Sequence, residues 1–291
     1  MRDPTEGRAV SSGPLAILAG GGDFPGLVAA AARARGREVI IAAIRGEAGP
    51  SIEAFPHRWV GRGQLGTVLR LFRDAGARDL VIVGGIRDRR LPRLCELDFG
   101  AVVEFLRNLR ILRRGDDSLL RKIARIFERR GLRIVGAGEA APDLLMRAGA
   151  LGEARPDASA RADIECGIAA ARDHGARDLG QAVIVVDGRV VAREGRDGTD
   201  AMLAAHAATR RPGEPRRGVL VKLPKPIQDL RLDMPAIGCG TVDAAASAGL
   251  AGIAVEAGGT LVADAAGVGA AADAAGLWVW GFPPQTGRGA A

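Results

Sequence analysis

Short apolar runs alternate with helical patterns along the first half of the chain. Leu15–Ala19 predicts a buried strand that ends in three glycines, and apolar positions over 27–35 recur with helical spacing. A strand over 38–44, a helix over 64–75 and a strand over 80–83 continue the series. Buried runs of Val, Ile and Leu, bounded by glycine and joined by such helices, predict a parallel sheet covered on both faces.

Two Arg-rich amphipathic helices are predicted next, over 99–112 and 118–130. Between about 136 and 155 the chain turns to Gly, Ala and Pro and loses its strand pattern, which indicates a domain boundary. We therefore expect an α/β protein with an N-terminal Rossmann-like parallel-sheet domain over 13–145 and a second α/β domain over 146–282.

The second half repeats the alternation of strands and helices. Asp187 and Gly188 separate two apolar runs and form a favoured type I′ hairpin pair. The predicted helices cover 159–173, 199–208, 241–248 and 263–275, and the predicted strands cover 182–186, 189–193, 219–223, 253–256 and 277–280.

Composition narrows the class of protein. The chain has 291 residues, 47% of them apolar, which is enough for one large or two ordinary domains with real cores. Cys95, Cys166 and Cys239 lie about seventy residues apart without a CxxC pair, so neither a disulfide framework nor a zinc site is expected, and a reducing cytoplasm fits best. No apolar run approaches the roughly 18 to 20 residues of a membrane-spanning helix, so any membrane contact is expected to be peripheral.

The net charge of +7 favours an anionic partner such as a phosphate, a nucleic acid or an acidic lipid surface. Aromatic residues make up only 3% of the chain, which disfavours a nucleic-acid reader. Of the 41 basic residues 38 are Arg, and the three Lys are Lys122, Lys222 and Lys225. Lys suits a single phosphate oxygen better than the planar Arg fork, although Lys222 and Lys225 could also lie on a solvated loop.

Gly20, Gly21, Gly22 and Asp23 follow the first strand and open a helix, where backbone amides and a helix N-terminus can hold phosphate. Pro25 takes the third glycine position of a GxGxxG motif, and no acidic residue ends the second strand, so a nicotinamide or flavin site is disfavoured. A phosphate or nucleotide site and a plain tight turn both remain open. The three histidines are too scattered for a catalytic triad.

The densest polar segment covers 222–235. Three prolines exclude a regular helix, and an extended course would place Asp229, Arg231 and Asp233 on one face with leucines on the other. Carboxylates for Mg²⁺ and its water, with cations for phosphate charge, suit phosphoryl transfer. A solvated edge strand with alternating charges is the alternative. Nearby, Thr199 is expected to cap a helix with Asp200 in its first turn.

Three strings together resemble the LpxI family, the UDP-2,3-diacylglucosamine pyrophosphatases. They are AxLAGGGDFP near the start, the EGRDGTDAM turn, and KLPKPIQDLRLDMPAIG, and the match runs in order from about residue 15 to residue 281. The resemblance implies Mg²⁺-dependent hydrolysis to UMP and 2,3-diacylglucosamine 1-phosphate (lipid X), an early step of lipid A synthesis. It also implies a lipid product held in the cleft between two α/β domains, and an essential acid in the C-terminal domain.

Carried onto this sequence, the essential acid is Asp233 or Asp229, with Asp233 preferred. Ile227 departs from the small residue expected at its position, which bears on the course of the loop rather than on the reaction. The resemblance thus marks Asp233, Asp229 and Lys225 as catalytic, Asp233 and Asp229 also as metal ligands, and Gly21, Gly22, Asp23, Thr199, Asp200, Lys222, Gln228 and Arg231 as substrate-binding.

A diacyl substrate would also explain the Arg-rich helices, whose Arg side chains would face the anionic inner leaflet; a solvated face is the alternative. Rival functions are a non-catalytic nucleotide or glycolipid carrier and a Rossmann oxidoreductase. The sequence leaves open which phosphorus is attacked and whether the chain forms a homodimer. The Arg residues concerned are Arg107, Arg110, Arg113, Arg114, Arg121 and Arg125.

Overall fold

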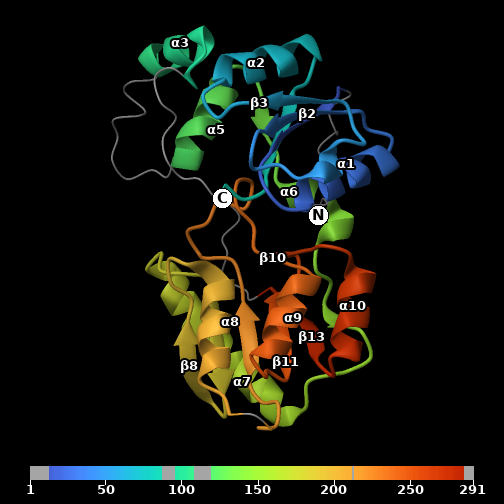
Figure 1. Ribbon diagram of the computed structural model, residues 1–291, viewed down its shortest axis with the longest axis vertical. Coiled ribbons are helices and arrows are strands. Elements are labelled where there is room, and N and C mark those ends of the chain that lie inside the picture. Colours follow the sequence, from blue (N-terminus) through green and yellow to red (C-terminus); the bar gives the residue numbers. More distant parts are fainter. Residues whose placement is uncertain (1–12, 87–95, 108–118, 212, 285–291) are drawn as a thin grey trace, which may run out of the picture. The chain divides into compact units, whose positions relative to one another are not determined.

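The computed structural model describes residues 13–86, 96–107, 119–211 and 213–284 (Figure 1). Contacts divide the chain into two compact units, one ending at Ala141 and the other beginning at Pro142. We refer to them as unit 1 and unit 2.

Unit 1 is built on an all-parallel sheet with strand order β3-β2-β1-β4-β5. This is the order of doubly wound folds, whose ligands bind outside the carboxyl ends of the strands where the order reverses, here between β1 and β4. Strands β1 and β2 consist entirely of apolar residues because both of their faces are covered. The strands are β1 (Leu15–Ala19), β2 (Val39–Ile44), β3 (His57–Val60), β4 (Asp79–Val83) and β5 (Arg133–Ile134).

Helices of unit 1 pack against this sheet. Helix α1 contacts β1 and β2, α2 contacts β2 and α3, and α5 contacts β5. Phe72 of α2 and Phe127 of α5 are fully buried, with ring centroids 6.4 Å apart, so these two helices share one core. The helices are α1 (Phe24–Ala34), η1 (Pro50–Ile52), α2 (Leu65–Asp74), α3 (Phe99–Arg107), α5 (Leu119–Arg129) and α6 (Ala137–Ala140).

Unit 2 has a six-stranded mixed sheet with strand order β6-β13-β11-β9-β7-β8. Strands β9, β11 and β13 are parallel, whereas β6, β7 and the hairpin partner β8 are attached antiparallel. A separate parallel pair joins β10 to β12. The strands are β6 (Gly149–Leu151), β7 (Ala182–Val186), β8 (Arg189–Arg193), β9 (Val219–Lys222), β10 (Ala236–Ile237), β11 (Gly252–Glu256), β12 (Leu261–Val262) and β13 (Trp278–Phe282).

The two faces of the unit 2 sheet have separate cores. Leu220 of β9 packs with residues of α8, α9 and α10, whereas its neighbours Val219 and Val221 pack with α7, as the two-residue repeat of a strand requires. The helices are η3 (Pro142–Leu144), α7 (Ala158–Ala176), α8 (Gly198–Ala208), α9 (Cys239–Ser247) and α10 (Ala265–Ala274).

The expected α/β class, with a parallel sheet in the first half, is confirmed. The hairpin at Asp187 and Gly188 is also confirmed, since both residues have the positive φ of a type I′ turn, 51° and 74°. Strand β3 was not predicted, because Val60 is its one buried residue and a polar edge strand carries little apolar signal. The predicted Arg-rich helices begin as expected at 99 and near 119, and residues 108–118 lie outside the described residues.

Candidate functional site

The carboxyl edge of the unit 2 sheet gathers most of the residues expected in the site. Lys222 ends β9, and the segment 223–235 leaves the six-stranded sheet there and leads to β10, which pairs with β12 in a separate two-stranded sheet. Because β8 runs antiparallel to β7, and β7 antiparallel to β9, Glu194 just after β8 reaches the same edge. The topology therefore brings two polar segments of the C-terminal half, 194–200 and 222–235, together at this edge. We call the segment 223–235 the acidic loop.

The acidic loop is folded into two consecutive turns, so the expected extended course is wrong. The backbone N–H of Gln228 donates to the Lys225 carbonyl at 3.0 Å. Pro226 takes the second position of this turn, where proline is favoured. The amides of Leu232 and Asp233 then donate to the Asp229 carbonyl at 2.9 and 3.0 Å. The second turn is reinforced by the Asp229 carboxylate, which accepts from the Arg231 amide at 3.0 Å, an interaction that competes with extended backbone.

Asp229 and Arg231 form a two-point ion pair within the loop. The Arg231 Nη2 and Nε atoms lie 2.7 and 3.0 Å from the two carboxylate oxygens of Asp229. A fork-to-fork pair of this kind is directional and satisfies both oxygens of the carboxylate. Asp229 therefore helps to hold the folded shape of the loop.

Asp233 occupies the end of the loop and is exposed. One of its carboxylate oxygens accepts a hydrogen bond of 2.6 Å from the side-chain amide of Gln228. The oxygen of that same Gln228 amide accepts from the Lys225 backbone N–H at 2.9 Å. Of the two loop carboxylates, Asp233 is thus the one that faces solvent without a cation paired to it at short range in the described part of the chain.

Lys225 is held by a residue outside the loop. Its ammonium lies 2.6 Å from the carboxylate of Asp178, just after α7, and its side chain is 23% exposed. Gly175 of α7 leaves room for the Lys225 backbone and stem, since a Cβ there would lie 3.1 Å from Lys225 Cγ. This contact straps the first turn of the loop to the end of α7.

Lys222 lies beneath the loop and is 8% exposed. Its ammonium donates to the Ala236 carbonyl at 3.1 Å and so ties the end of β9 to the start of β10. Burial lowers the pKa of Lys222, while the negative charges of Glu194, Asp200 and Asp233 oppose that shift. Four charged residues from three segments therefore share one electrostatic environment here.

Glu194 and Thr199 form the buried wall of this cluster. The Thr199 hydroxyl donates to the Glu194 carboxylate at 3.2 Å, and the Gln181 amide donates to the same oxygen at 3.3 Å. Helix α8 begins at Gly198 after Asp197, so the expectation that Thr199 caps the helix is wrong: its hydroxyl is used by Glu194 instead. Asp200 does lie in the first turn, where the helix dipole favours a carboxylate.

Glu194 and Asp178 were not predicted as neighbours of the loop. Both are close to the loop only through the fold, since Asp178 is 47 residues from Lys225 along the chain. A signal was present for Glu194, because a carboxylate directly after a predicted strand and before a helix lies at a sheet edge. For Asp178 the chain offers no comparable pattern.

In unit 1 the glycine loop lies at the switch point between β1 and β4. Gly21 and Gly85 exchange backbone hydrogen bonds of 2.7 and 3.1 Å, and Gly20 donates to Val83. A Cβ on Gly20 would lie 2.6 Å from the Gly84 carbonyl oxygen, so glycine is required for this approach. The amide of Gly21 is thereby used within the protein, while Gly22 and Asp23 follow it at the start of α1.

Two other polar clusters of unit 1 have structural explanations. The Asp98 carboxylate accepts from the amides of Gly66, Thr67 and Ala101 and thus occupies the N-termini of both α2 and α3. Burial alone would raise the pKa of Asp98, but these hydrogen bonds, with one from the Thr67 hydroxyl, lower it. A helix N-terminus that could hold a ligand anion is in this case filled by the protein's own carboxylate.

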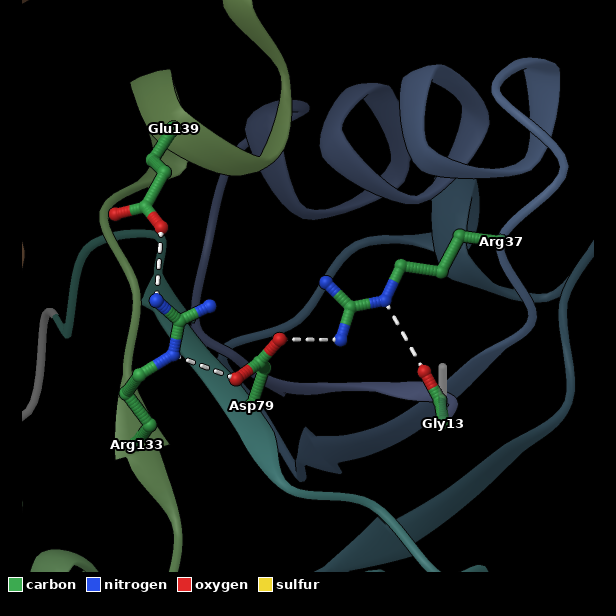
Figure 2. A network of polar contacts seen from close by, with 5 residues as sticks. All are labelled: Gly13, Arg37, Asp79, Arg133 and Glu139. Carbon is green, nitrogen blue, oxygen red and sulfur yellow. Dashed lines mark hydrogen bonds and ion pairs between the residues drawn. The ribbon is translucent and has the colours of Figure 1, made fainter. Parts of the chain in front are cut away.

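Figure 2 shows the second cluster, centred on Asp79. Asp79 is 1% exposed and contacts Arg37 at 2.6 Å and Arg133 at 2.8 Å; Arg37 also donates to the Gly13 carbonyl, and Arg133 reaches Glu139 at 3.2 Å. Asp79 raises the pKa of Arg133. Asp79 and Arg133 begin β4 and β5, and Gly13 and Arg37 precede β1 and β2, so this cluster joins the amino ends of the strands.

These observations define a two-unit α/β protein whose second sheet carries a folded loop of carboxylates and lysines at the carboxyl ends of its strands. Comparison with known proteins identifies the family to which this α/β protein belongs. Residues 14–144 match the model of the LpxI N-terminal domain, and residues 147–280 match that of the LpxI C-terminal domain. The chain is 40% identical over 250 residues to the UDP-2,3-diacylglucosamine pyrophosphatase LpxI of Caulobacter vibrioides, which covers 82% of this chain and 86% of the relative.

The chain therefore belongs to the LpxI family, and the resemblance drawn from the sequence is confirmed. The relative is named as a hydrolase of a nucleotide-linked glycolipid, which agrees with the expectation of an enzyme. Among the residues that the structure describes, no helix is long and apolar enough to cross a bilayer.

Proposed function

We propose that this protein hydrolyses the pyrophosphate bond of UDP-2,3-diacylglucosamine to UMP and lipid X, as a step of lipid A synthesis. Family membership supports the reaction, because the relative from Caulobacter vibrioides is named for the same substrate and bond. The observation in this chain that carries the proposal is the exposed Asp233 carboxylate, held at the carboxyl edge of a sheet above a buried lysine.

In the proposed reaction a water oxygen attacks one of the two phosphorus atoms in line with the bridging oxygen. The P–O bond to the bridge breaks, and the two protons of the water are shared out to the phosphate products and solvent. Asp233 is the exposed acceptor that orients this water or takes its proton. Lys222, Lys225 and Arg231 add positive charge around a substrate that carries two phosphates.

The remaining candidates have supporting parts in this proposal. Thr199 and Asp200 lie at the start of α8 on the same edge, where they would line the substrate site. Gly22 and Asp23 offer backbone at the switch point of the unit 1 sheet for a phosphate or the nucleotide, while Gly21, whose backbone pairs with Gly85, holds this turn in place. Gln228 and Asp229 shape the loop in addition to any contact they make with substrate.

The donor set suits Mg²⁺ bound largely through the substrate. Within the described residues no three His, Cys, Asp or Glu side chains gather into a metal site, and Asp229 is paired with Arg231. Mg²⁺ commonly takes one or two carboxylates and completes its shell with water and substrate phosphates. We propose Asp233 as the principal protein ligand and Asp229 as the weaker candidate; Mg²⁺ would supply charge neutralisation at the phosphates and a more acidic water.

We further propose that the protein works in the cytoplasm at the anionic inner face of the inner membrane. Unit 1 has 25 basic and 16 acidic residues, whereas unit 2 has 16 and 18, so the basic surplus lies wholly in unit 1. On α3 the Phe99 side chain is 84% exposed and Val102, one turn later, is 38% exposed. Cosedimentation with phosphatidylglycerol vesicles should exceed that with phosphatidylcholine vesicles, and Phe99→Ser should weaken it; equal binding to both lipids would contradict this part of the proposal.

The reaction is tested by UMP release from UDP-2,3-diacylglucosamine with Mg²⁺. The wild type should release UMP, and Asp233→Ala should lose about 100-fold or more in kcat with an unchanged melting temperature. Asp229→Ala should lose less, and Asp243→Ala, an exposed carboxylate on α9, serves as the matched control. Glycolipid binding without any UMP would instead indicate a carrier, and near-normal turnover by both loop variants would remove the loop from the chemistry.

A further inference from the structure

We propose that Gln228 is a positioning residue that aims the Asp233 carboxylate. The proposal rests on the proposed function, since it concerns the group that we place at the reaction. Gln228 lies at the junction of the two turns of the acidic loop, and its side chain touches both: its oxygen contacts the first turn at Lys225, and its nitrogen contacts Asp233 after the second.

The orientation of the Gln228 amide is fixed by chemistry. A backbone N–H can only donate, so the atom that meets the Lys225 amide at 2.9 Å must be the Gln228 oxygen. The other end of the amide is then the NH₂ group, which can only donate, and it meets Asp233 Oδ2 at 2.6 Å. The Lys225 backbone N–H therefore fixes the Gln228 side chain so that its NH₂ group faces Asp233. One oxygen of the Asp233 carboxylate accepts this hydrogen bond.

This bond leaves the second oxygen of Asp233 for substrate, water or metal. A carboxylate on a loop rotates about two side-chain torsions unless a neighbour holds it, and catalytic groups depend on such support for their geometry. Within the described residues Gln228 is the side chain that makes a hydrogen bond to the Asp233 carboxylate, while Arg231 is taken up by Asp229. The loop therefore divides its carboxylates into one that shapes the backbone and one that is aimed.

Gln228→Glu separates aiming from loop folding. The carboxylate of the variant still accepts from the Lys225 amide, so the first turn is kept, but it has no donor for Asp233 and repels it. Loss of an outer support of this kind typically costs 10- to 100-fold. We expect Gln228→Glu to lower kcat about 10- to 100-fold with KM within about threefold of wild type, and Gln228→Leu to behave similarly. Ile227→Gln, at the adjacent exposed position, should stay near wild type.

A binding measurement distinguishes aiming from direct contact with substrate. In the Asp233→Ala background, Gln228→Leu, which adds no charge near the phosphates, should leave the Kd for intact UDP-2,3-diacylglucosamine unchanged, because the group that Gln228 positions is already absent. A Kd at least tenfold weaker in the double variant would show that Gln228 binds substrate and would overturn the proposal. Near-normal kcat for Gln228→Glu would also overturn it while the wild type still releases UMP; a wild type that releases no UMP would instead end the proposed function and this inference with it.

Discussion

Asp79 in unit 1 and Asp233 in unit 2 are two carboxylates at opposite kinds of sheet edge. Asp79 begins a strand, is 1% exposed and is met by two guanidinium groups (Figure 2). Asp233 follows a strand end, is exposed and is met by one neutral amide. In parallel α/β sheets ligands bind at the carboxyl ends of the strands, so polar groups at that edge remain available for ligands, whereas those at the amino edge can be paired within the fold.

The difference between the two carboxylates lies in what each could still bind. The oxygens of Asp79 are both taken by Arg37 and Arg133, so its charge is neutralised within the fold. Asp233 is exposed, and its negative charge opposes the lowering of the Lys222 pKa without a hydrogen bond between the two side chains in the described structure. The comparison separates a buried acid whose charge is paired within the fold from an exposed acid that keeps room for another partner, which is the acid we propose at the reaction.

The largest effect is expected at Asp79. Asp79→Ala removes the shared partner of two guanidinium groups that lie against the sheet, and breaking such a pair costs about 3 kcal/mol or more. For a unit of this size that corresponds to a fall of roughly 6 to 10 °C in its melting temperature. Calorimetry should show this loss with kcat of the folded fraction retained. Asp79→Asn, which can still accept hydrogen bonds, should lose less, and a variant that lost kcat without losing stability would reverse the comparison.

An intermediate loss of activity is expected when the ion pair between Lys225 and Asp178 is broken. Asp178→Ala breaks a pair whose acid is 63% exposed, and exposed pairs contribute less than about 1 kcal/mol, so kcat/KM should fall no more than about fivefold. Lys225→Ala removes the strap and also a positive charge beside the substrate, and should cost about tenfold or more. Steady-state UMP release compares the two variants. Equal losses would mean that Lys225 acts only as a strap.

The smallest effect is a pH dependence that comes from Asp98. Its pKa is lowered in the fold, so its contribution to stability is complete above the unfolded value and is lost as pH falls through the lower, folded value. Below about pH 4 the melting temperature of the wild type should therefore fall more steeply than that of Asp98→Asn. Asp74→Asn, at a mostly exposed acid, is the control; parallel pH profiles for Asp98→Asn and the wild type would contradict the assignment.

The sequence predicts a structural feature well when the interactions behind it join residues that are close together along the chain. The central strands β1 and β2 were predicted because their apolar runs are complete in themselves, whereas the polar edge strand β3 was not. The acidic loop was identified from its residue types, but its course was wrong, because the bond from the Asp229 carboxylate to the Arg231 amide folds it into a turn. The contacts of Glu194 and Asp178 depend on chain segments that only the fold brings together.

The bond between Lys222 and the Ala236 carbonyl closes the base of the acidic loop, so the segment between them forms a ring that begins at the end of β9 and ends at the start of β10. Its two turns and its ion pair are internal to that ring. As a consequence, a loop taken from a relative should fit between these two anchor points if it keeps a buried apolar residue in place of Leu223 and a partner for Asp178 in place of Lys225. Substrate preference and sheet stability would then be tuned separately, one within the ring and the other beneath it.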